Sequence, residues 1–224
     1  MPKTRFENRH SAGKLLADAL KVYSWRRDVI VLGLPRGGVP VAYEVAKELH
    51  LPLDVFIVRK LGAPGQPELA MGAIAMNNFT VLNNDIVREL RISHHDIDQV
   101  LAAEQQELKR REKIYRRDKP PLDVENKIII LVDDGIATGA SMRVAILALR
   151  TLRPAFIIVA VPVIEKSVLA ALSHDADKVI CLSKPGDFKS VGAYYHEFDQ
   201  TRDQEVLDLL ADNYCKGRHN EAGH

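Results

Sequence analysis

Two adjacent aspartates are the residues best suited to chemistry in this sequence. Asp133 and Asp134 follow an apolar run at 128–132 and precede a turn of small and hydroxyl-bearing residues at 135–141. Backbone N–H groups, hydroxyls and the start of a following helix can bind a phosphate there. Carboxylates repel phosphate, but they accept hydrogen bonds from sugar hydroxyls or bind Mg²⁺. The stretch therefore predicts a site for a phosphorylated ribose.

Two common nucleotide-binding motifs are missing from the sequence. The turn at 135–141 lacks the GxxxxGK[ST] spacing and contains no lysine, which excludes a P-loop nucleoside triphosphatase. The segment Gly33–Gly38 reads GLPRGG and does not satisfy GxGxxG, so the dinucleotide fingerprint is absent.

The elements that would position the aspartates alternate between strands and helices. A helix is predicted from about Ser141 to Leu152, and another after the turn Pro35–Gly38. Strands that are apolar throughout are typical of a parallel sheet covered on both faces. The sequence thus predicts a doubly wound α/β fold. Its strands are expected at 29–34, 53–58, 127–132, 155–163 and 178–182.

Two segments depart from this alternation. From His94 to about Arg117, a narrow apolar stripe predicts a long, largely solvated helix, capped at its start by Ser93 and Asp96. Its interleaved acids and bases favour a packing surface or a homodimer seam over a nucleic-acid surface. The segment 59–72 is rich in Gly and Pro, which predicts a mobile loop, and long loops of this kind are often functional.

Composition limits the class of protein further. The chain has 224 residues, 31 Lys+Arg against 30 Asp+Glu, and 46% apolar residues. This excludes a disordered tail and a nucleic-acid binder driven by bulk charge. The longest apolar stretch, 156–164, is too short to span a bilayer, and Met1–Glu7 lacks the layout of a signal peptide. Because Cys181 and Cys215 have neither CxxC nor zinc-type spacing, we expect a reduced, cytoplasmic protein without a membrane or nucleic-acid partner.

The stretch Val132–Ser141 resembles the binding motif for phosphoribosyl pyrophosphate in type I phosphoribosyltransferases: an apolar strand, two acidic residues and a Thr-Gly-containing turn. The likeness extends to Leu34–Gly38, which is similar to the family's pyrophosphate-binding loop, and to Arg59 and Lys60, which would open its flexible catalytic loop. It covers about residues 29–182, and the chain looks closest to an uncharacterised branch of the family.

This resemblance implies one phosphoribosyltransferase-like domain over residues 1–224. Its mainly parallel, doubly wound core would cover about 29–182. A small C-terminal hood and a C-terminal helix would follow at about 183–215, and the long helix would be an insertion.

The resemblance also implies transfer of ribose 5-phosphate from phosphoribosyl pyrophosphate to a nitrogen acceptor, a nucleobase, with release of pyrophosphate. Asp133 and Asp134 would hold the ribose hydroxyls directly or through Mg²⁺. Arg59 and Lys60 would add positive charge when the loop closes over the leaving group. The 5-phosphate would be bound by Ala137, Thr138, Gly139, Ala140 and Ser141, and the pyrophosphate by Arg36, Gly37 and Gly38.

The acceptor site is less closely defined. Ala137 stands where hypoxanthine-guanine members carry an Asp near the purine, and alanine cannot accept a proton. The Ala-Thr-Gly sequence looks more like the adenine type, in which a loop carboxylate assists, and Glu68 is the candidate here. In the hood, Phe188 or Tyr194 could stack on a base. The acidic residues that could accept from a base N–H are Asp187, Glu197 and Asp199.

A non-catalytic sensor of phosphoribosyl pyrophosphate or of a nucleotide, with a regulatory role, is the alternative. Such a sensor would need to bind only the ribose phosphate. Retention of Arg36, Arg59 and Lys60 favours catalysis, because departure of pyrophosphate requires cations.

Overall fold

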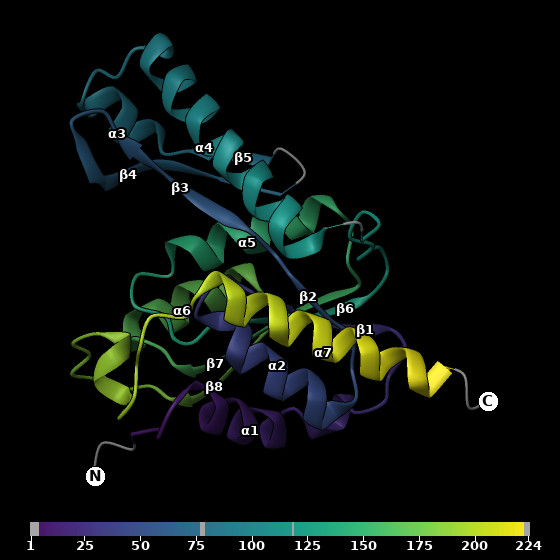
Figure 1. Ribbon diagram of the computed structural model, residues 1–224. Coiled ribbons are helices and arrows are strands. Elements are labelled where there is room, and N and C mark those ends of the chain that lie inside the picture. The colour runs from purple at the N-terminus through teal and green to yellow at the C-terminus, as the bar shows by residue number, and fades with distance from the viewer. Residues whose placement is uncertain (1–4, 77–78, 118, 222–224) are drawn as a thin grey trace.

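The fold is built on a five-stranded sheet whose neighbouring strands are all parallel, in the order β2-β1-β6-β7-β8 (Figure 1). The computed structural model describes residues 5–76, 79–117 and 119–221. The predicted doubly wound α/β fold is confirmed. The strands are β1 (Val29–Gly33), β2 (Leu53–Val55), β6 (Ile128–Val132), β7 (Phe156–Val163) and β8 (Lys178–Ser183).

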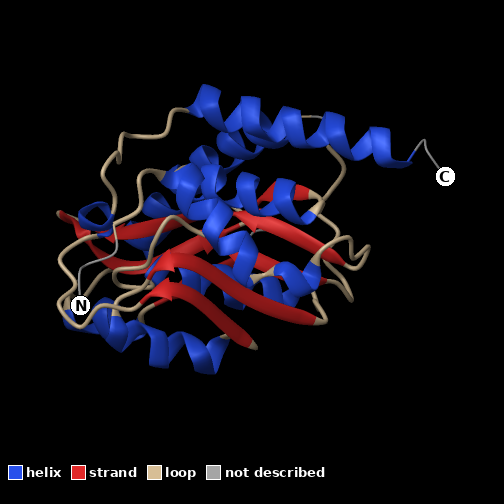
Figure 2. Cartoon of the chain, turned by 90° about the horizontal axis from the view of Figure 1, so that it is seen from below, coloured by secondary structure: helices blue, strands red, loops and turns tan. Residues whose placement is uncertain are grey.

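Helices cover both faces of this sheet, as Figure 2 shows. α1 and α2 pack together on one face, and α7 packs on α2. α5 and α6 pack together on the other face. Right-handed crossovers that run from the sheet centre toward opposite edges place their helices on opposite faces of the sheet. The predicted helices after Gly38 and near Ser141 are both present. The bounds are α1 (Arg9–Ala19), α2 (Gly38–Leu49), α5 (Ala140–Thr151), α6 (Lys166–Asp175) and α7 (Asp203–Glu221).

The prediction of one strand over 53–58 is wrong. β2 ends at Val55, where Phe56 donates its N–H to the Gly33 carbonyl at 3.1 Å, and the chain then leaves the parallel sheet. A new strand, β3 (Val58–Ala63), starts three residues after Val55 and belongs to a separate antiparallel sheet with β4 (Gln66–Ala75) and β5 (Phe79–Leu82).

The prediction of a mobile loop over 59–72 is also wrong, because this segment forms the β3–β4 hairpin. Gly65 takes a φ of 74° in the two-residue turn between the paired residues Ala63 and Gln66. Register shifts on either side of Gly62 make the ladder irregular where Pro67 faces it. Leu61 is fully buried, so a few apolar side chains suffice to order the hairpin despite its Gly and Pro content.

The predicted long helix is confirmed as α4 (His94–Arg116), which follows the short α3 (Asn84–Glu89). The Ser93 hydroxyl accepts the Asp96 N–H at 3.2 Å and caps the start of α4, as expected. We call β3–β5, α3 and α4 the arm. In Figure 1 the arm projects from the parallel sheet, and α4 packs along β3 and β4.

A second, smaller core lies beside the main one and joins the first residues of the chain to the hood. Phe6 donates its N–H to the Tyr194 carbonyl at 2.8 Å, and its own carbonyl accepts from the His196 N–H at 2.9 Å. The aromatic segment at 188–198 is therefore built together with residues 6–9. The buried members of this core are Phe6, Ala12, Val163, Tyr194 and Tyr195.

Two short 3₁₀ turns complete the fold, η1 (Lys21–Tyr23) and η2 (Val191–Tyr194). α7 runs to Glu221, beyond the predicted end of the hood at about 215. Cys181 is a free thiol, and the Cys215 side chain lies outside the described residues. Within the described ranges, no helix combines the length and the apolar character that crossing a membrane requires.

Candidate functional site

The two most informative sequence segments meet at the centre of the sheet. β1 and β6 are neighbours in the sheet, with Gly33 opposite Val132, and their connections depart in opposite directions. The carboxyl ends of strands at such a switch point form the usual ligand crevice of open α/β sheets. The turn at 34–38 after β1 and the turn at 133–139 after β6 therefore lie side by side at this edge.

Gly37 and Gly38 pack directly on the two aspartates. A Cβ at Gly37 would lie 2.1 Å from Asp134 Oδ2, and a Cβ at Gly38 would lie 2.9 Å from Asp133 Cα. At Gly38 the same Cβ would also lie 2.8 Å from the Val132 carbonyl oxygen. Only glycine allows this approach, which brings the predicted pyrophosphate loop against the predicted ribose-binding carboxylates.

Asp133 and Asp134 share a crowded and partly dehydrated position. Burial raises the pKa of Asp133 well above its usual range, and the neighbouring Asp134 carboxylate raises it further. Burial also raises the pKa of Asp134, although Arg9 opposes that shift. The Asp134 N–H donates to Asp133 Oδ1 at 2.9 Å and orients that carboxylate. Two crowded carboxylates of this kind suit a ligand that brings hydroxyl donors or a cation.

The donor set fits Mg²⁺ held jointly with a ligand. Within the part of the chain that the structure describes, no group of three or more His, Cys, Asp or Glu side chains could hold a metal ion. Mg²⁺ is commonly bound by one or two carboxylates, with substrate phosphates and water completing its shell. Asp133 and Asp134 would be the protein's contribution.

Arg9 is a site residue that the sequence analysis missed. Its Nε donates to Asp134 Oδ2 at 2.8 Å, and its NH1 donates to the Asp199 carbonyl oxygen at 2.7 Å. Its guanidinium also lies 3.8 Å from the centre of the Phe198 ring. Arg9 thus ties the start of α1 and the hood to the carboxylate pair. A lone arginine near the N-terminus carries no sequence signal for such a role.

The predicted phosphate turn is open to solvent at the positions that would face a ligand. Thr138 and Ser141 are exposed, as are Ala137 and Ala140. Gly139 is buried, takes a φ of 73° and stands at the N-cap of α5, where no side chain caps the helix. The first N–H groups of α5 therefore point toward the turn without a side-chain acceptor, an arrangement that suits an oxyanion.

The hood segment borders the carboxylates, but it does not offer two aromatic platforms. The Tyr195 hydroxyl donates to the Asp134 carbonyl oxygen at 2.6 Å, and Val191 lies against Gly135. Tyr194 is only 2% exposed, so the expectation that its ring could stack on a base is wrong. Phe188 is half-buried and stacks on Tyr194, with 5.5 Å between ring centres.

The three acidic candidates in the hood are all exposed, namely Asp187, Glu197 and Asp199. The backbone carbonyl of Asp187 accepts from the Tyr194 hydroxyl at 3.0 Å, and that of Asp199 accepts from Arg9 at 2.7 Å. Their carboxylates remain candidates for contacts with a base.

The predicted catalytic residues Arg59, Lys60 and Glu68 lie on the arm and not at the sheet edge. Arg59 contacts Glu104 of α4 at 2.6 Å, and Lys60 Nζ lies 3.4 Å from Glu68 Oε2 across the hairpin. Among the described residues, no hydrogen bond or ion pair joins these three to residues 133–141. Arg59, Lys60 and Glu104 line a cavity of about 570 Å³ between the hairpin and α4.

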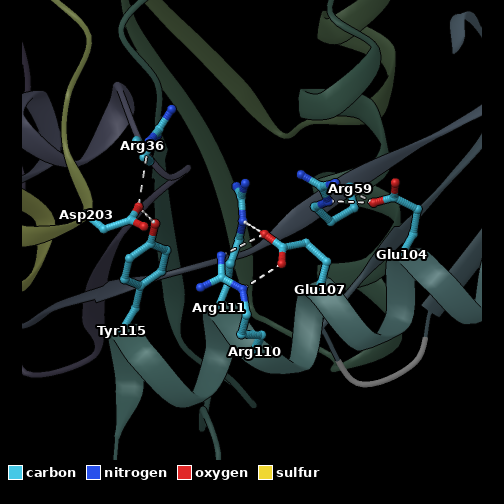
Figure 3. Close-up of polar contacts among 8 residues, drawn as sticks. All are labelled: Arg36, Arg59, Glu104, Glu107, Arg110, Arg111, Tyr115 and Asp203. Carbon is cyan, nitrogen blue, oxygen red and sulfur yellow. Dashed lines mark hydrogen bonds and ion pairs between the residues drawn. The ribbon is translucent and has the colours of Figure 1, made fainter.

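Arg36 also faces the arm and α7. Its NH1 lies 3.8 Å from Asp203 Oδ1, and the same oxygen accepts from the Tyr115 hydroxyl at 2.5 Å (Figure 3). Burial raises the pKa of Tyr115 to about 12, assisted by the hydrogen bond with Asp203. Neither Tyr115 nor Asp203 was among the predicted site residues.

Comparisons with known proteins agree with this arrangement. A family model described as "Phosphoribosyl transferase domain" matches residues 6–199. Two Mycobacterium tuberculosis proteins, "Putative phosphoribosyl transferase MT0597" (strain CDC 1551 / Oshkosh) and "Putative phosphoribosyl transferase Rv0571c" (strain ATCC 25618 / H37Rv), are each 44% identical to this chain over 205 residues. The match covers 92% of this chain but 46% of each relative, so the chain spans about half of their length.

A solved structure has a similar fold over nearly the whole chain. The crystal structure of TT1426 from Thermus thermophilus has 41% sequence identity and a TM-score of 0.79, and the match covers 93% of this chain and 98% of that one. Together with the geometry at the sheet edge, these matches show that the chain belongs to the phosphoribosyl transferase domain family.

Proposed function

We propose that this chain transfers ribose 5-phosphate from phosphoribosyl pyrophosphate to a nitrogen acceptor, with a nucleobase as the acceptor class, and releases pyrophosphate. The observation that carries the proposal is the contact of Gly37 and Gly38 with Asp133 and Asp134 at the switch point of the sheet. This contact places a backbone turn rich in N–H groups next to two carboxylates. A ligand with phosphates on both sides of a ribose needs both features.

The ribose and its 5-phosphate would be held at the end of β6. In this proposal Asp133 and Asp134 accept hydrogen bonds from ribose hydroxyls, which donate to ionised carboxylates. The turn residues Thr138 and Ser141 and the first N–H groups of α5 bind the 5-phosphate together with Ala137, Gly139 and Ala140. The open, uncapped start of α5 supports this assignment.

Mg²⁺ would be held at the same two carboxylates. When bound, it would offset the charge of the pyrophosphate as that group leaves with its bonding electrons. The raised pKa values of Asp133 and Asp134, caused first by burial, support the need for a cation or hydroxyl donors at this position.

The leaving pyrophosphate would be bound by Arg36 and by the backbone N–H groups of Gly37 and Gly38. Charge that develops on this group in the transition state is stabilised best by donors already in place. Arg59 and Lys60 would join when the hairpin, ordered as it is, moves as one unit toward the sheet edge and excludes water. Glu68, which is 99% exposed, would act as the base on the acceptor only in that closed form.

The acceptor would lie under the hood, beside Phe188. Because Ala137 cannot accept a proton, the proposal does not extend to six-oxopurine chemistry. A cytoplasmic location and a homodimer built on α4 remain part of the proposal.

Release of pyrophosphate tests the function directly. The wild type is incubated with phosphoribosyl pyrophosphate, Mg²⁺ and a pool of purine and pyrimidine bases, beside the double variant Asp133→Asn/Asp134→Asn. We expect release that depends on the pool and is lost in the double variant. Asp18→Asn, an exposed change on α1 that leaves the sheet edge intact, is the matched control and should behave as the wild type.

Two other outcomes would contradict parts of the proposal. Unchanged release in the double variant would overturn the assignment of Asp133 and Asp134. Binding of phosphoribosyl pyrophosphate without release of pyrophosphate in the presence of any of the bases would favour the alternative of a non-catalytic sensor.

A further inference from the structure

The two arginines that the proposed function assigns to pyrophosphate each contact a carboxylate of the protein. Arg59 places Nε and NH2 each 2.6 Å from Glu104 Oε2. Arg36 places NH1 3.8 Å from Asp203 Oδ1. A phosphate oxygen and a carboxylate oxygen bind a guanidinium in the same way, so each carboxylate occupies a position that a phosphate would take.

Both carboxylates are held by α4. Glu104 belongs to the helix, and Asp203 accepts the hydroxyl of Tyr115, which lies eleven residues further along α4. The two anchoring residues are therefore about 16 Å apart along the helix axis. In Figure 3, Arg36 and Arg59 lie toward opposite ends of this stretch of α4, each facing its carboxylate.

We propose that Glu104 and Asp203 are internal competitors of pyrophosphate, which hold Arg59 and Arg36 until the ligand replaces them. The inference rests on the proposed function, because it gives those arginines the same ligand. Ligand entry is then an exchange of carboxylate for phosphate at each guanidinium, with no covalent step. Through Glu104 and Tyr115, the inserted helix limits affinity for the pyrophosphate group and so favours release of the product.

The geometry predicts that Glu104 and Asp203 weaken pyrophosphate binding to different extents. Glu104 and Arg59 have side chains that are 24% and 26% exposed and contact at 2.6 Å, whereas Asp203 and Arg36 are 44% and 32% exposed and contact at 3.8 Å. A closer and less hydrated ion pair is harder to replace. Removing the charge of Glu104 should therefore strengthen ligand binding more than removing that of Asp203.

Calorimetric titration with inorganic pyrophosphate, at fixed Mg²⁺ and ionic strength, tests this proposal. Glu104→Gln and Asp203→Asn remove the charge but keep an oxygen that can accept from Arg59 or Tyr115. We expect pyrophosphate to bind about fivefold more tightly to Glu104→Gln and about twofold more tightly to Asp203→Asn than to the wild type. A merely structural role for either carboxylate would give weaker binding instead.

Glu112→Gln is the matched control on the same helix. Glu112 lies 3.9 Å from Arg116, which is buried, is bound to Asp54 and lies outside the proposed site. The affinity of this variant for pyrophosphate should equal that of the wild type. Equal tightening in Glu112→Gln would overturn the proposal, because it would trace the effect to net charge alone.

The remaining outcomes separate this inference from the proposed function. Binding to the wild type that weakens in Arg36→Gln supports the proposed site, and unchanged or weaker binding in Glu104→Gln and Asp203→Asn then overturns the internal competition alone. No binding of pyrophosphate to the wild type would overturn both. Glu104→Ser and Asp203→Ser serve as second variants if an amide disturbs the fold.

Discussion

The edge of the parallel sheet and the arm position their charged residues in different ways. At the sheet edge, two glycines contact Asp133 and Asp134 with backbone atoms, and the carboxylates are partly dehydrated. On the arm, Arg59 and Lys60 are held by side-chain ion pairs that stay partly in water. A backbone contact cannot be exchanged for a ligand, whereas a solvated ion pair can. The edge is therefore suited to define a ligand's position, and the arm to respond to it.

The largest effect on stability is expected at the edge, from Gly38→Ala. The new Cβ would lie 2.8 Å from the Val132 carbonyl oxygen and 2.9 Å from Asp133 Cα, both backbone atoms of a central strand end that cannot move aside. We expect a loss of about 3 kcal/mol in the free energy of unfolding, measured in urea, together with loss of ligand binding. Gly186→Ala, whose Cβ would meet nothing within 4 Å, is the control. If Gly38→Ala were as stable as this control, the backbone contacts at the sheet edge would be no more rigid than the ion pairs of the arm.

A smaller loss is expected for Arg9→Gln, which breaks the contact between α1 and Asp134. Both side chains are nearly buried, and the change leaves a dehydrated carboxylate without its cation. The free energy of unfolding should fall by about 1–2 kcal/mol. Arg26→Gln removes an arginine from an exposed ion pair with Asp28 and should leave the unfolding midpoint unchanged. Equal midpoints for the two variants would show that Arg9 contributes no more than a surface arginine.

The opposite effect, a gain in the free energy of unfolding, is expected for Asp133→Asn in the ligand-free protein. Because burial and Asp134 raise the pKa of Asp133 in the folded state, this carboxyl group opposes folding at every pH above the pKa of the unfolded aspartate. The amide keeps an oxygen for the Asp134 N–H and removes the charge, so the free energy of unfolding should rise by about 0.5–2 kcal/mol. The gain should shrink as the pH falls toward the pKa of the unfolded aspartate, where the wild type no longer carries this penalty. Urea unfolding at several pH values measures it, and a gain that is constant with pH would contradict the assigned cause.

The smallest effect is expected on the arm, for Glu68→Gln. Its side chain is 99% exposed, and its carboxylate comes no closer than 3.4 Å to Lys60 Nζ. The ion pair therefore adds little to the stability of the hairpin. The melting temperature and the hydrogen exchange of the hairpin amides should match those of the wild type. A change in turnover in this variant would then report the chemistry of Glu68 alone. Faster exchange across β3 and β4 would show instead that side-chain pairs order the arm.

Much of the core and its edge could be predicted from local patterns. Continuous apolar runs at 29–34 and 128–132 indicate buried parallel strands, and residues directly after such strands must lie at one sheet edge. The arm could not be predicted in this way. Its hairpin contains Gly62, Gly65 and Pro67, which usually indicate a loop. The hairpin is ordered because β3 and β4 pack against both α4 and α5.

The sequence by itself determined the parallel α/β core and the position of two aspartates before a turn of small and hydroxyl-bearing residues, because both follow from the order of neighbouring residues. Only the tertiary structure decided that Arg9 contacts Asp134, that Tyr194 is buried, and that Arg36 and Arg59 contact carboxylates near α4. These contacts join residues far apart in the chain, and their free energies depend on burial and distance, which no local pattern contains.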